Sequence, residues 1–290
     1  MAGWDDILKE LGQTPSQVDF IRRKYLCQLA EYTGRSTIAY YSAFLNKQGP
    51  NLDVNDADME GFMNAVKDLD CKKGLDLILH TPGGDPTAAE AIVNYLKDKF
   101  NKDIRVIVPQ IAMSAGTMIA CSAKEIIMGK QSSLGPIDPQ FSGIPAYNIM
   151  QEFIEAREDL AINPQNAQYW AIKLQQYPAA FMKSAIDAID LSDELIRNWL
   201  SDVMLKGKRK TVINKAVDFL TSHESSKVHA RHYRYQECRD HGLIIKLMED
   251  DNELQDKILS VHHCFMITLQ STEALKMISN NLKKDYIIKG

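Results

Sequence analysis

Hydrophobic positions along the chain follow two patterns, one with the spacing of buried strands and one with the spacing of helices. Residues 74–80 form a short apolar run that ends in a turn at Gly83 and Gly84, so they predict a buried strand. Residues 87–96 place apolar side chains three and four apart, which predicts a helix, and residues 103–109 form a second β-branched run. Strand, helix and strand in this order predict a βαβ unit with parallel strands.

The same alternation continues toward the middle of the chain and then gives way to helices. Residues 112–121 are small and have helical spacing, and residues 125–129 form another strand. Residues 146–204 have helical spacing throughout. Gly242 suits the end of a helix that precedes a last short strand.

Helical spacing at both ends completes a single-domain prediction. Residues 4–47 predict two amphipathic helices, and residues 250–282 predict terminal helices. A chain of 290 residues can still be built around one core. We therefore expect one domain over residues 1–290, made of an N-terminal helical part (1–70), an α/β core (71–145), a helical segment (146–220), and an α/β return with C-terminal helices (221–290).

The net charge and the length of the apolar runs limit which kinds of binding partner the sequence predicts. The formal net charge is −4, so no overall positive field exists to hold nucleic acid or an anionic membrane. The basic cluster Lys206, Lys208, Arg209 and Lys210 is the local exception, and we interpret it as a solvated loop. No window approaches ~20 apolar residues, and the first residues lack the pattern of a secretory signal. We expect a cytoplasmic protein without a membrane span.

Cysteine and histidine spacing argues against a disulfide framework and a metal centre. The five cysteines are an odd number, lie far apart and form no Cys-x-x-Cys pair. His262, His263 and Cys264 have no further ligand nearby, so we assign them to packing. We expect reduced cysteines, no metal and no cofactor.

Two features that follow neighbouring strands carry the candidate chemistry. The Gly83-Gly84 turn ends one strand, and Ser114 opens the helix after the next strand, so both belong at the carboxyl edge of a parallel sheet. Glycine amides that no Cβ screens can stabilise a tetrahedral oxyanion, and the amide of Ala115 is a further candidate donor. Taken alone, Ser114 could equally be an N-cap.

These residues carry a family resemblance. Thr81-Pro82-Gly83-Gly84-Asp85, followed by Met113-Ser114-Ala115-Gly116-Thr117, resembles the paired motifs of the Clp protease proteolytic subunit and of signal peptide peptidase A. The segment Leu134-Gly135-Pro136-Ile137-Asp138-Pro139 extends this likeness. Together with it, the sequence is similar to the serine dehydrogenase proteinase family over about residues 20–282.

The resemblance implies a Clp/crotonase-like α/β fold, with a parallel βαβ core, N-terminal helices, an inserted helical segment and C-terminal helices. It implies a serine endopeptidase with Ser114 as nucleophile and Gly83, Gly84 and Ala115 around the oxyanion. A peptide or unfolded protein would be the substrate, and the protein would be a homo-oligomer. Whether an ATPase delivers the substrate stays open.

The general base is not fixed by this resemblance. The chain has no histidine between His80 and His223, whereas the Clp subunit carries its histidine soon after the serine. Signal peptide peptidase A uses a desolvated lysine instead. We therefore favour Lys173, whose neighbours are apolar, over Lys183.

Three further residues are candidates for the general base or for a group that orients it. His229 and His232 are alternative bases, although a surface or structural role explains each of them better. Asp138 could orient a base, bind the substrate backbone, or cap the following turn. Besides a peptidase, a crotonase-like acyl-CoA enzyme and a catalytically silent scaffold of the same fold stay open.

Overall fold

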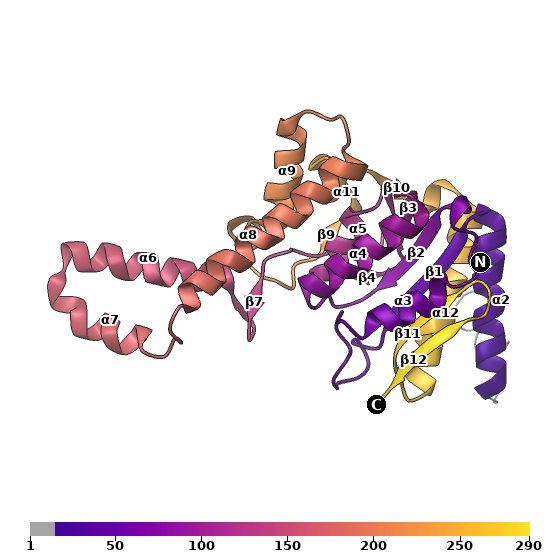
Figure 1. Ribbon diagram of the computed structural model, residues 1–290, viewed down its shortest axis with the longest axis horizontal. Coiled ribbons are helices and arrows are strands. Elements are labelled where there is room, and N and C mark those ends of the chain that lie inside the picture. The colour runs from indigo at the N-terminus through magenta and orange to yellow at the C-terminus, as the bar shows by residue number, and fades with distance from the viewer. Residues whose placement is uncertain (1–14) are drawn as a thin grey trace.

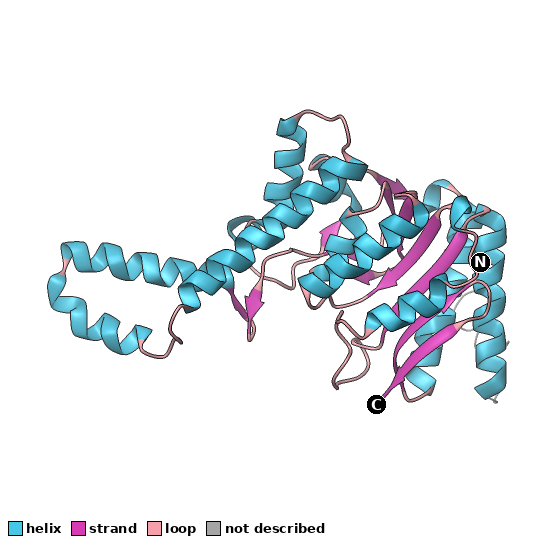
Figure 2. Cartoon of the chain, viewed as in Figure 1, coloured by secondary structure: helices cyan, strands magenta, loops and turns pink. Residues whose placement is uncertain are grey.

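A seven-stranded sheet forms the centre of the computed structural model, which describes residues 15–290 (Figures 1 and 2). Its strands, in spatial order, are β10 (Ile245–Leu247), β5 (Glu125–Met128), β3 (Ile104–Val108), β2 (Leu75–His80), β1 (Ser36–Ser42), β11 (Ala274–Asn280) and β12 (Asp285–Lys289). The first five are mutually parallel, whereas β11 is antiparallel to β1 and to β12. The sheet is thus mostly parallel, as expected.

Two smaller sheets extend the carboxyl edge of the central one. One contains β4 (Ile111–Ala112), β6 (Ser133–Leu134) and β9 (Tyr233–Arg234), and the other contains β7 (Gln140–Phe141) and β8 (Ile144–Pro145). The strand β6 pairs in parallel with β4 and antiparallel with β9. Segments about a hundred residues apart in the sequence therefore lie side by side.

Helices cover both faces of the central sheet. The helices α3 (Asp58–Val66), α4 (Pro86–Phe100) and α5 (Ala115–Cys121) pack on one face, and α2 (Pro15–Thr33) and α12 (Asn252–Ser271) pack on the other (Figure 1). Strand side chains alternate between the two cores: Leu77 and Leu79 of β2 join the first, and Ile78 joins the second. Burial on both faces explains why this strand is a nearly continuous apolar run.

A helical arm projects from this body, as Figure 1 shows. It consists of α6 (Ala146–Ile162), the 3-10 turn η2 (Pro164–Asn166), α7 (Ala167–Leu174) and the first part of α8 (Phe181–Trp199). Ala146, Ile149 and Ala185 form a small core of its own. The chain returns through the π-helical turn η3 (Leu200–Met204), α9 (Lys210–Thr221), α10 (His223–Ser226) and α11 (Tyr235–Asp240). Two further 3-10 turns are η1 (Cys71–Lys73) and η4 (Met248–Asp250).

The strands and helices expected between residues 74 and 129 are confirmed. The strands β2 and β3 are parallel, and α4 connects them as the helix of a βαβ unit. Gly242 lies between α11 and β10, as expected for a glycine that ends a helix. Its φ of +97° is a left-handed value that glycine adopts readily. Across residues 15–290, no helix combines the length and apolar character that crossing a membrane would require.

The helical prediction for the N-terminal part is wrong beyond Thr33. Residues 36–42 form β1, which lies between β2 and β11 with every residue buried. Its β-branched and aromatic residues suit a strand covered on both faces, and Gly34 at φ +66° ends the preceding helix. The part of the prediction that falls on residues 4–14 lies outside the described residues.

The prediction of terminal helices over residues 250–282 is half wrong. The helix α12 ends at Ser271, and the next residues form β11, which is buried along its whole length. The strand pairs with β1 from Ile38↔Asn280 to Ser42↔Lys276. Pairing with a strand more than two hundred residues away overrides local helical spacing, which sequence periodicity cannot detect.

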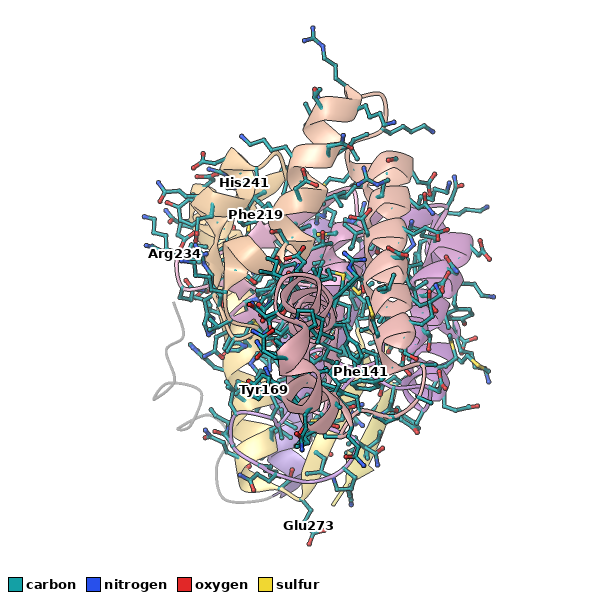
Figure 3. All side chains as sticks on the ribbon, turned by 90° about the vertical axis from the view of Figure 1, so that its left-hand side faces the viewer. Phe141, Tyr169, Phe219, Arg234, His241 and Glu273 are labelled. Carbon is teal, nitrogen blue, oxygen red and sulfur yellow. The ribbon has the colours of Figure 1, made fainter. Side chains whose placement is uncertain are left out.

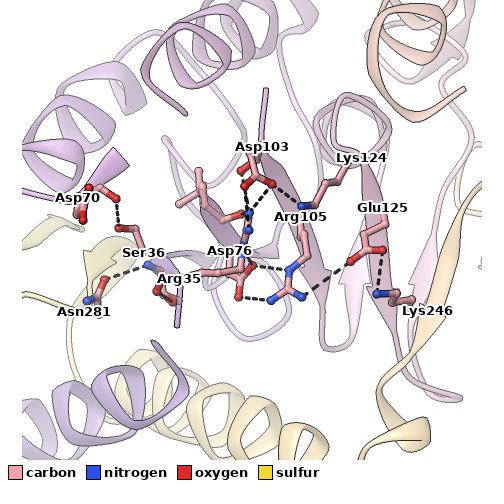
Figure 4. A network of polar contacts seen from close by, with 12 residues as sticks. Arg35, Ser36, Asp70, Asp76, Asp103, Arg105, Lys124, Glu125, Lys246 and Asn281 are labelled. Atoms are coloured by element: carbon pink, nitrogen blue, oxygen red, sulfur yellow. Dashed lines mark hydrogen bonds and ion pairs between the residues drawn. The ribbon is translucent and has the colours of Figure 1, made fainter. Parts of the chain in front are cut away.

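A row of charged side chains crosses the amino edge of the parallel strands (Figure 4). Asp76, fully buried on β2, accepts hydrogen bonds from Arg35 at 2.8 Å and from Arg105 at 2.6 and 2.7 Å. Arg105 also faces Glu125, and Glu125 pairs with Lys246. The network joins β2, β3, β5 and β10 at the edge opposite the glycine turn.

A buried histidine cluster predicts acid-sensitive stability. His80 packs against Tyr41, Phe44 and His262, and its Nε2 lies 3.2 Å from Oε1 of Gln110. Burial lowers the pKa of His80 to about 4 and lowers that of His262 as well. Between the ordinary value of 6.5 and this one, the unfolded chain binds the proton and the folded chain does not. The stability that His80 contributes is therefore fully present above its unfolded pKa, and about 3 kcal/mol of it is lost as the pH falls to the folded pKa.

Urea unfolding at pH 7 and pH ~4.5 measures this effect. We expect His80→Gln to flatten the loss of stability on acidification, since its amide does not titrate. His232→Gln is the matched control for replacing a histidine by glutamine, because that side chain is exposed. An unaltered slope in His80→Gln would contradict the assignment.

Candidate active site

Ser114 occupies a sharp strand-to-helix turn between β4 and α5. Its backbone has φ +48° and ψ −116°, a region that side-chain-bearing residues rarely adopt. It stands at the N-cap position of α5, yet its side chain makes no capping hydrogen bond. The simple N-cap interpretation therefore does not explain this serine, whereas strained strand-to-helix turns are known to present a nucleophile.

Gly83 approaches this turn so closely that only glycine fits. Its φ is +97°, and a Cβ there would lie 2.6 Å from the carbonyl oxygen of Met113 and 2.7 Å from Cβ of Ser114. It would also lie 3.1 Å from the amide nitrogen of Ala115. The glycine turn and the serine turn are thus in direct backbone contact.

The peptide unit between Gly83 and Gly84 has a fixed orientation. The carbonyl of Gly83 accepts a hydrogen bond from the amide of Val54 at 2.7 Å. In a trans peptide the N–H points away from its own carbonyl, so the amide of Gly84 is directed away from Val54. The amide of Gly83, in contrast, donates to Oγ1 of Thr81 at 3.2 Å. Of the two glycines, Gly84 is therefore the better placed donor.

A cleft of about 380 Å³ opens beside these turns, and both Ser114 and Gly84 line it. Its wall is mainly apolar and comes from α5, the loop before β7, and α8. The lining residues are Pro82, Gly84, Pro86, Ser114, Met118, Ile137, Pro139, Gln140, Phe141, Ala188, Ser192 and His229. The cleft therefore brings His229 to the same space as Ser114.

Asp138 connects two histidines beside the cleft. Its Oδ1 lies 2.7 Å from Nδ1 of His229, and its Oδ2 lies 3.0 Å from Nδ1 of His223. Gln140 donates a further hydrogen bond to Oδ2 at 2.9 Å. Burial by itself raises the pKa of the Asp138 carboxyl, but hydrogen bonds from His229 and His223 outweigh it and bring the pKa below its ordinary value. The ionised carboxylate requires the proton of His229 on Nδ1, which leaves Nε2 free to accept one.

Packing on both sides anchors the segment that carries these histidines. The ring of Phe219 on α9 stacks on His241 with centroids 4.0 Å apart. Figure 3 labels these two neighbouring residues. The ring of Phe219 also contacts Tyr233 of β9, which pairs with Leu134 of β6. Pairing of β9 with β6 explains why residues near 229 meet residues near 138.

The structure does not bring the favoured base, Lys173, to Ser114. Lys173 lies on α7 in the projecting arm, where its Nζ pairs with Glu152 at 2.6 Å and lines a separate hollow. The hydrogen bond that Lys173 donates to Glu152 raises the pKa of Lys173, which is the opposite of what a neutral lysine base requires. Its apolar neighbour Trp170 lies under the ammonium, but the hydrogen bond to Glu152 outweighs the desolvation that lowers the pKa.

The other two alternatives also lie outside the cleft lining. Lys183 is exposed on α8 and pairs with Asp187, which raises the pKa of this lysine as well. His232 bonds through Nδ1 to the hydroxyl of Ser133 at 2.7 Å. The partner that sequence reasoning missed is His223, because nothing in the local pattern ties it to a carboxylate 85 residues earlier.

Two curated relatives match part of the chain. Two uncharacterized proteins of Methanocaldococcus jannaschii, MJ0137 and MJ1495, are 42% and 39% identical to the chain over 104 residues. The matches cover 36% of this chain and 36% and 35% of those proteins, so the chain spans about a third of the length of the curated relatives it matches.

A solved structure and a family model were also matched. A mutant of the membrane-bound stomatin-specific protease 1510-N aligns with a TM-score of 0.44 and 17% identity, over 71% of this chain and 79% of that one. The model of ClpP-like SDH-type serine proteinases matches residues 51–224, which is more than half of the chain and includes the glycine turn, Ser114 and Asp138. The chain therefore belongs to the family of ClpP-like SDH-type serine proteinases.

Proposed function

We propose that this protein is a serine endopeptidase that cleaves extended or unfolded polypeptides through an acyl-enzyme on Ser114. The observation that carries the proposal is the strained, uncapped serine that shares one cleft with the His229–Asp138 pair and the glycine turn. Membership of a serine proteinase family supports the same reaction class.

In the acylation step, Oγ of Ser114 attacks the carbonyl carbon of the scissile peptide, and Nε2 of His229 accepts the hydroxyl proton. Asp138 holds the imidazole in the tautomer with Nδ1 protonated and stabilises the imidazolium that forms. The tetrahedral intermediate then collapses, the C–N bond breaks, and His229 returns the proton to the leaving amine. Water hydrolyses the resulting ester by the same sequence, with His229 again as base.

Two backbone amides are proposed to stabilise the oxyanion. The amide of Gly84 is directed away from Val54 and lies on the cleft wall. The amide of Ala115 belongs to the first residue of α5, where the helix offers it no acceptor. Gly83 supports this site by close contact, since any side chain there would collide with Ser114. Preorganised donors of this kind each contribute about 10²–10³ in rate.

Labelling with a fluorophosphonate probe tests the proposal directly. We expect one covalent adduct per chain, and peptide mapping by mass spectrometry should locate it on Ser114. The adduct should be absent from Ser114→Ala, because alanine lacks the attacking oxygen.

The alternative functions predict other results. Acyl-CoA binding without labelling would favour a crotonase-like enzyme, and absence of both would favour a silent scaffold. An adduct on another serine would contradict the assignment of Ser114 even if the protein hydrolysed casein.

A further inference from the structure

A fully buried lysine outside the cleft has no role in the reaction as described so far. Lys276 on β11 pairs with Asp58 at the start of α3, with 2.7 Å between Nζ and Oδ1 and no exposed side-chain surface on either residue. The hydroxyl of Tyr40 and the amide of Asn55 donate to the other oxygen of Asp58 at 2.8 and 3.1 Å. Since a buried ion pair is often no more stabilising than apolar residues of similar volume, stability alone does not account for it.

The second hydrogen bond of Lys276 leads to the glycine turn. Its Nζ donates to the carbonyl of Asp53 at 2.6 Å. That carbonyl belongs to the same trans peptide unit as the amide of Val54, which donates to the carbonyl of Gly83 at 2.7 Å. The carbonyl of Gly83 in turn belongs to the same peptide unit as the amide of Gly84. Two peptide units thus connect the ammonium group to the proposed oxyanion donor, head to tail.

Contacts around these two peptide units leave little freedom for movement. The amide of Asp85 donates back to the carbonyl of Val54 at 2.9 Å. A Cβ at Gly84 would lie 2.3 Å from that carbonyl oxygen and 2.4 Å from the amide nitrogen of Val54. The segment around Val54 is therefore a template that sets the plane of the Gly83–Gly84 peptide.

A parallel set of side-chain contacts reaches the same turn. Tyr40 donates to Asp58, and its hydroxyl lies close enough to Thr81 for that side chain to oppose the rise in the pKa of Tyr40. Oγ1 of Thr81 accepts the amide of Gly83. The buried Lys276–Asp58 pair is therefore connected to both peptide groups that flank Gly83.

We propose that Lys276 is a positioning residue for the peptidase reaction, whose ammonium orients and polarises the Gly84 amide through the Asp53–Val54 and Gly83–Gly84 peptide units. The inference rests on the proposed function, because it assumes that this amide stabilises the oxyanion. Hydrogen bonds aligned in a chain polarise one another, and the low dielectric of the interior strengthens the effect. The expected result is a larger stabilisation of the charged transition state than of the bound substrate.

The test uses a double variant, Lys276→Met with Asp58→Asn, in the full chain. Removing both charges avoids leaving an unpaired carboxylate in the core, and asparagine keeps an oxygen for Tyr40 and Asn55. The probe is a fluorophosphonate, with the maximal rate of inactivation and the half-saturating concentration measured separately. We expect the maximal rate to fall at least ~10-fold, with the half-saturating concentration within ~3-fold of the wild type, because the binding surface is untouched.

A matched control separates positioning from general destabilisation. Arg105→Met removes one arm of the buried ion pair with Asp76, at the opposite edge of the sheet, while Arg35 remains on that carboxylate (Figure 4). It should lower the melting temperature without changing either labelling constant. A fall in its maximal rate equal to that of the double variant would overturn the inference.

A second variant keeps the proposal testable if the double variant does not fold. Val54→Pro deletes the amide that donates to Gly83 and leaves the ion pair intact. We expect the same selective loss of maximal rate. A wild-type maximal rate in either folded variant, or a change confined to the half-saturating concentration, would overturn the positioning role. Absence of labelling in the wild type would instead overturn the proposed function, and the inference with it.

Discussion

Replacing Ser114 by alanine is expected to abolish hydrolysis of fluorescently labelled casein, with kcat falling on the order of 10⁶-fold. The reason is the loss of the only atom that can form the acyl bond, while the cleft, the glycine turn and the His229–Asp138 pair stay in place. The fall is measured as the ratio of kcat for the unsubstituted protein to kcat for the purified variant. Heat-inactivated protein gives the background rate that is subtracted from both. The residual rate should be that of oxyanion stabilisation and binding alone.

The fold should survive this substitution. Alanine at φ +48° is strained as serine is, and the serine side chain makes no capping hydrogen bond that would be lost. Ser122→Ala is a matched control, because it removes a hydroxyl from the other end of α5, where Oγ donates to the carbonyl of Ile119 at 2.7 Å. Full activity in Ser122→Ala and none in Ser114→Ala, at similar melting temperatures, is the expected pattern. Undiminished turnover in Ser114→Ala would end the assignment.

Sequence periodicity predicted the strands whose neighbours are near in sequence. The strands β2 and β3 are adjacent along the chain and buried on both faces, so their apolar runs are unambiguous. Helical spacing is misleading for β1 and β11, which pair with each other across more than two hundred residues. For β11 the deciding contact is this distant pairing, whereas for β1 the β-branched and aromatic residues after Gly34 are a local strand signal that the helical spacing concealed.

Only part of the candidate site was predictable from the sequence. The glycine turn and Ser114 follow consecutive strands of a parallel sheet, so topology alone brings them to one edge. Asp138 was a candidate without a partner, since its contacts with His223 and His229 depend on the pairing of β6 with β9. Lys173 was favoured for its apolar neighbours, but those neighbours belong to a projecting arm and not to the cleft.

His229 is expected to be the general base, so His229→Ala should lose most of kcat while Lys173→Met keeps it. In enzymes that work through a serine and a histidine, removal of the histidine alone approaches the effect of removing the serine, on the order of 10⁶. Lys173 should matter little, because its ammonium pairs with Glu152 away from the cleft. Acylation by the fluorophosphonate and turnover of casein should both show this contrast.

Chemical rescue and pH dependence distinguish a missing base from a damaged fold. The side chain of His229 is 33% exposed and lines the open cleft, so added imidazole should enter the space left by alanine and restore part of the activity. A lysine base would instead predict activity that rises into the alkaline range. If Lys173→Met lost activity and His229→Ala kept it, the assignment of the base would be reversed. The variant that lacks the group accepting the Ser114 proton is the one that must lose activity.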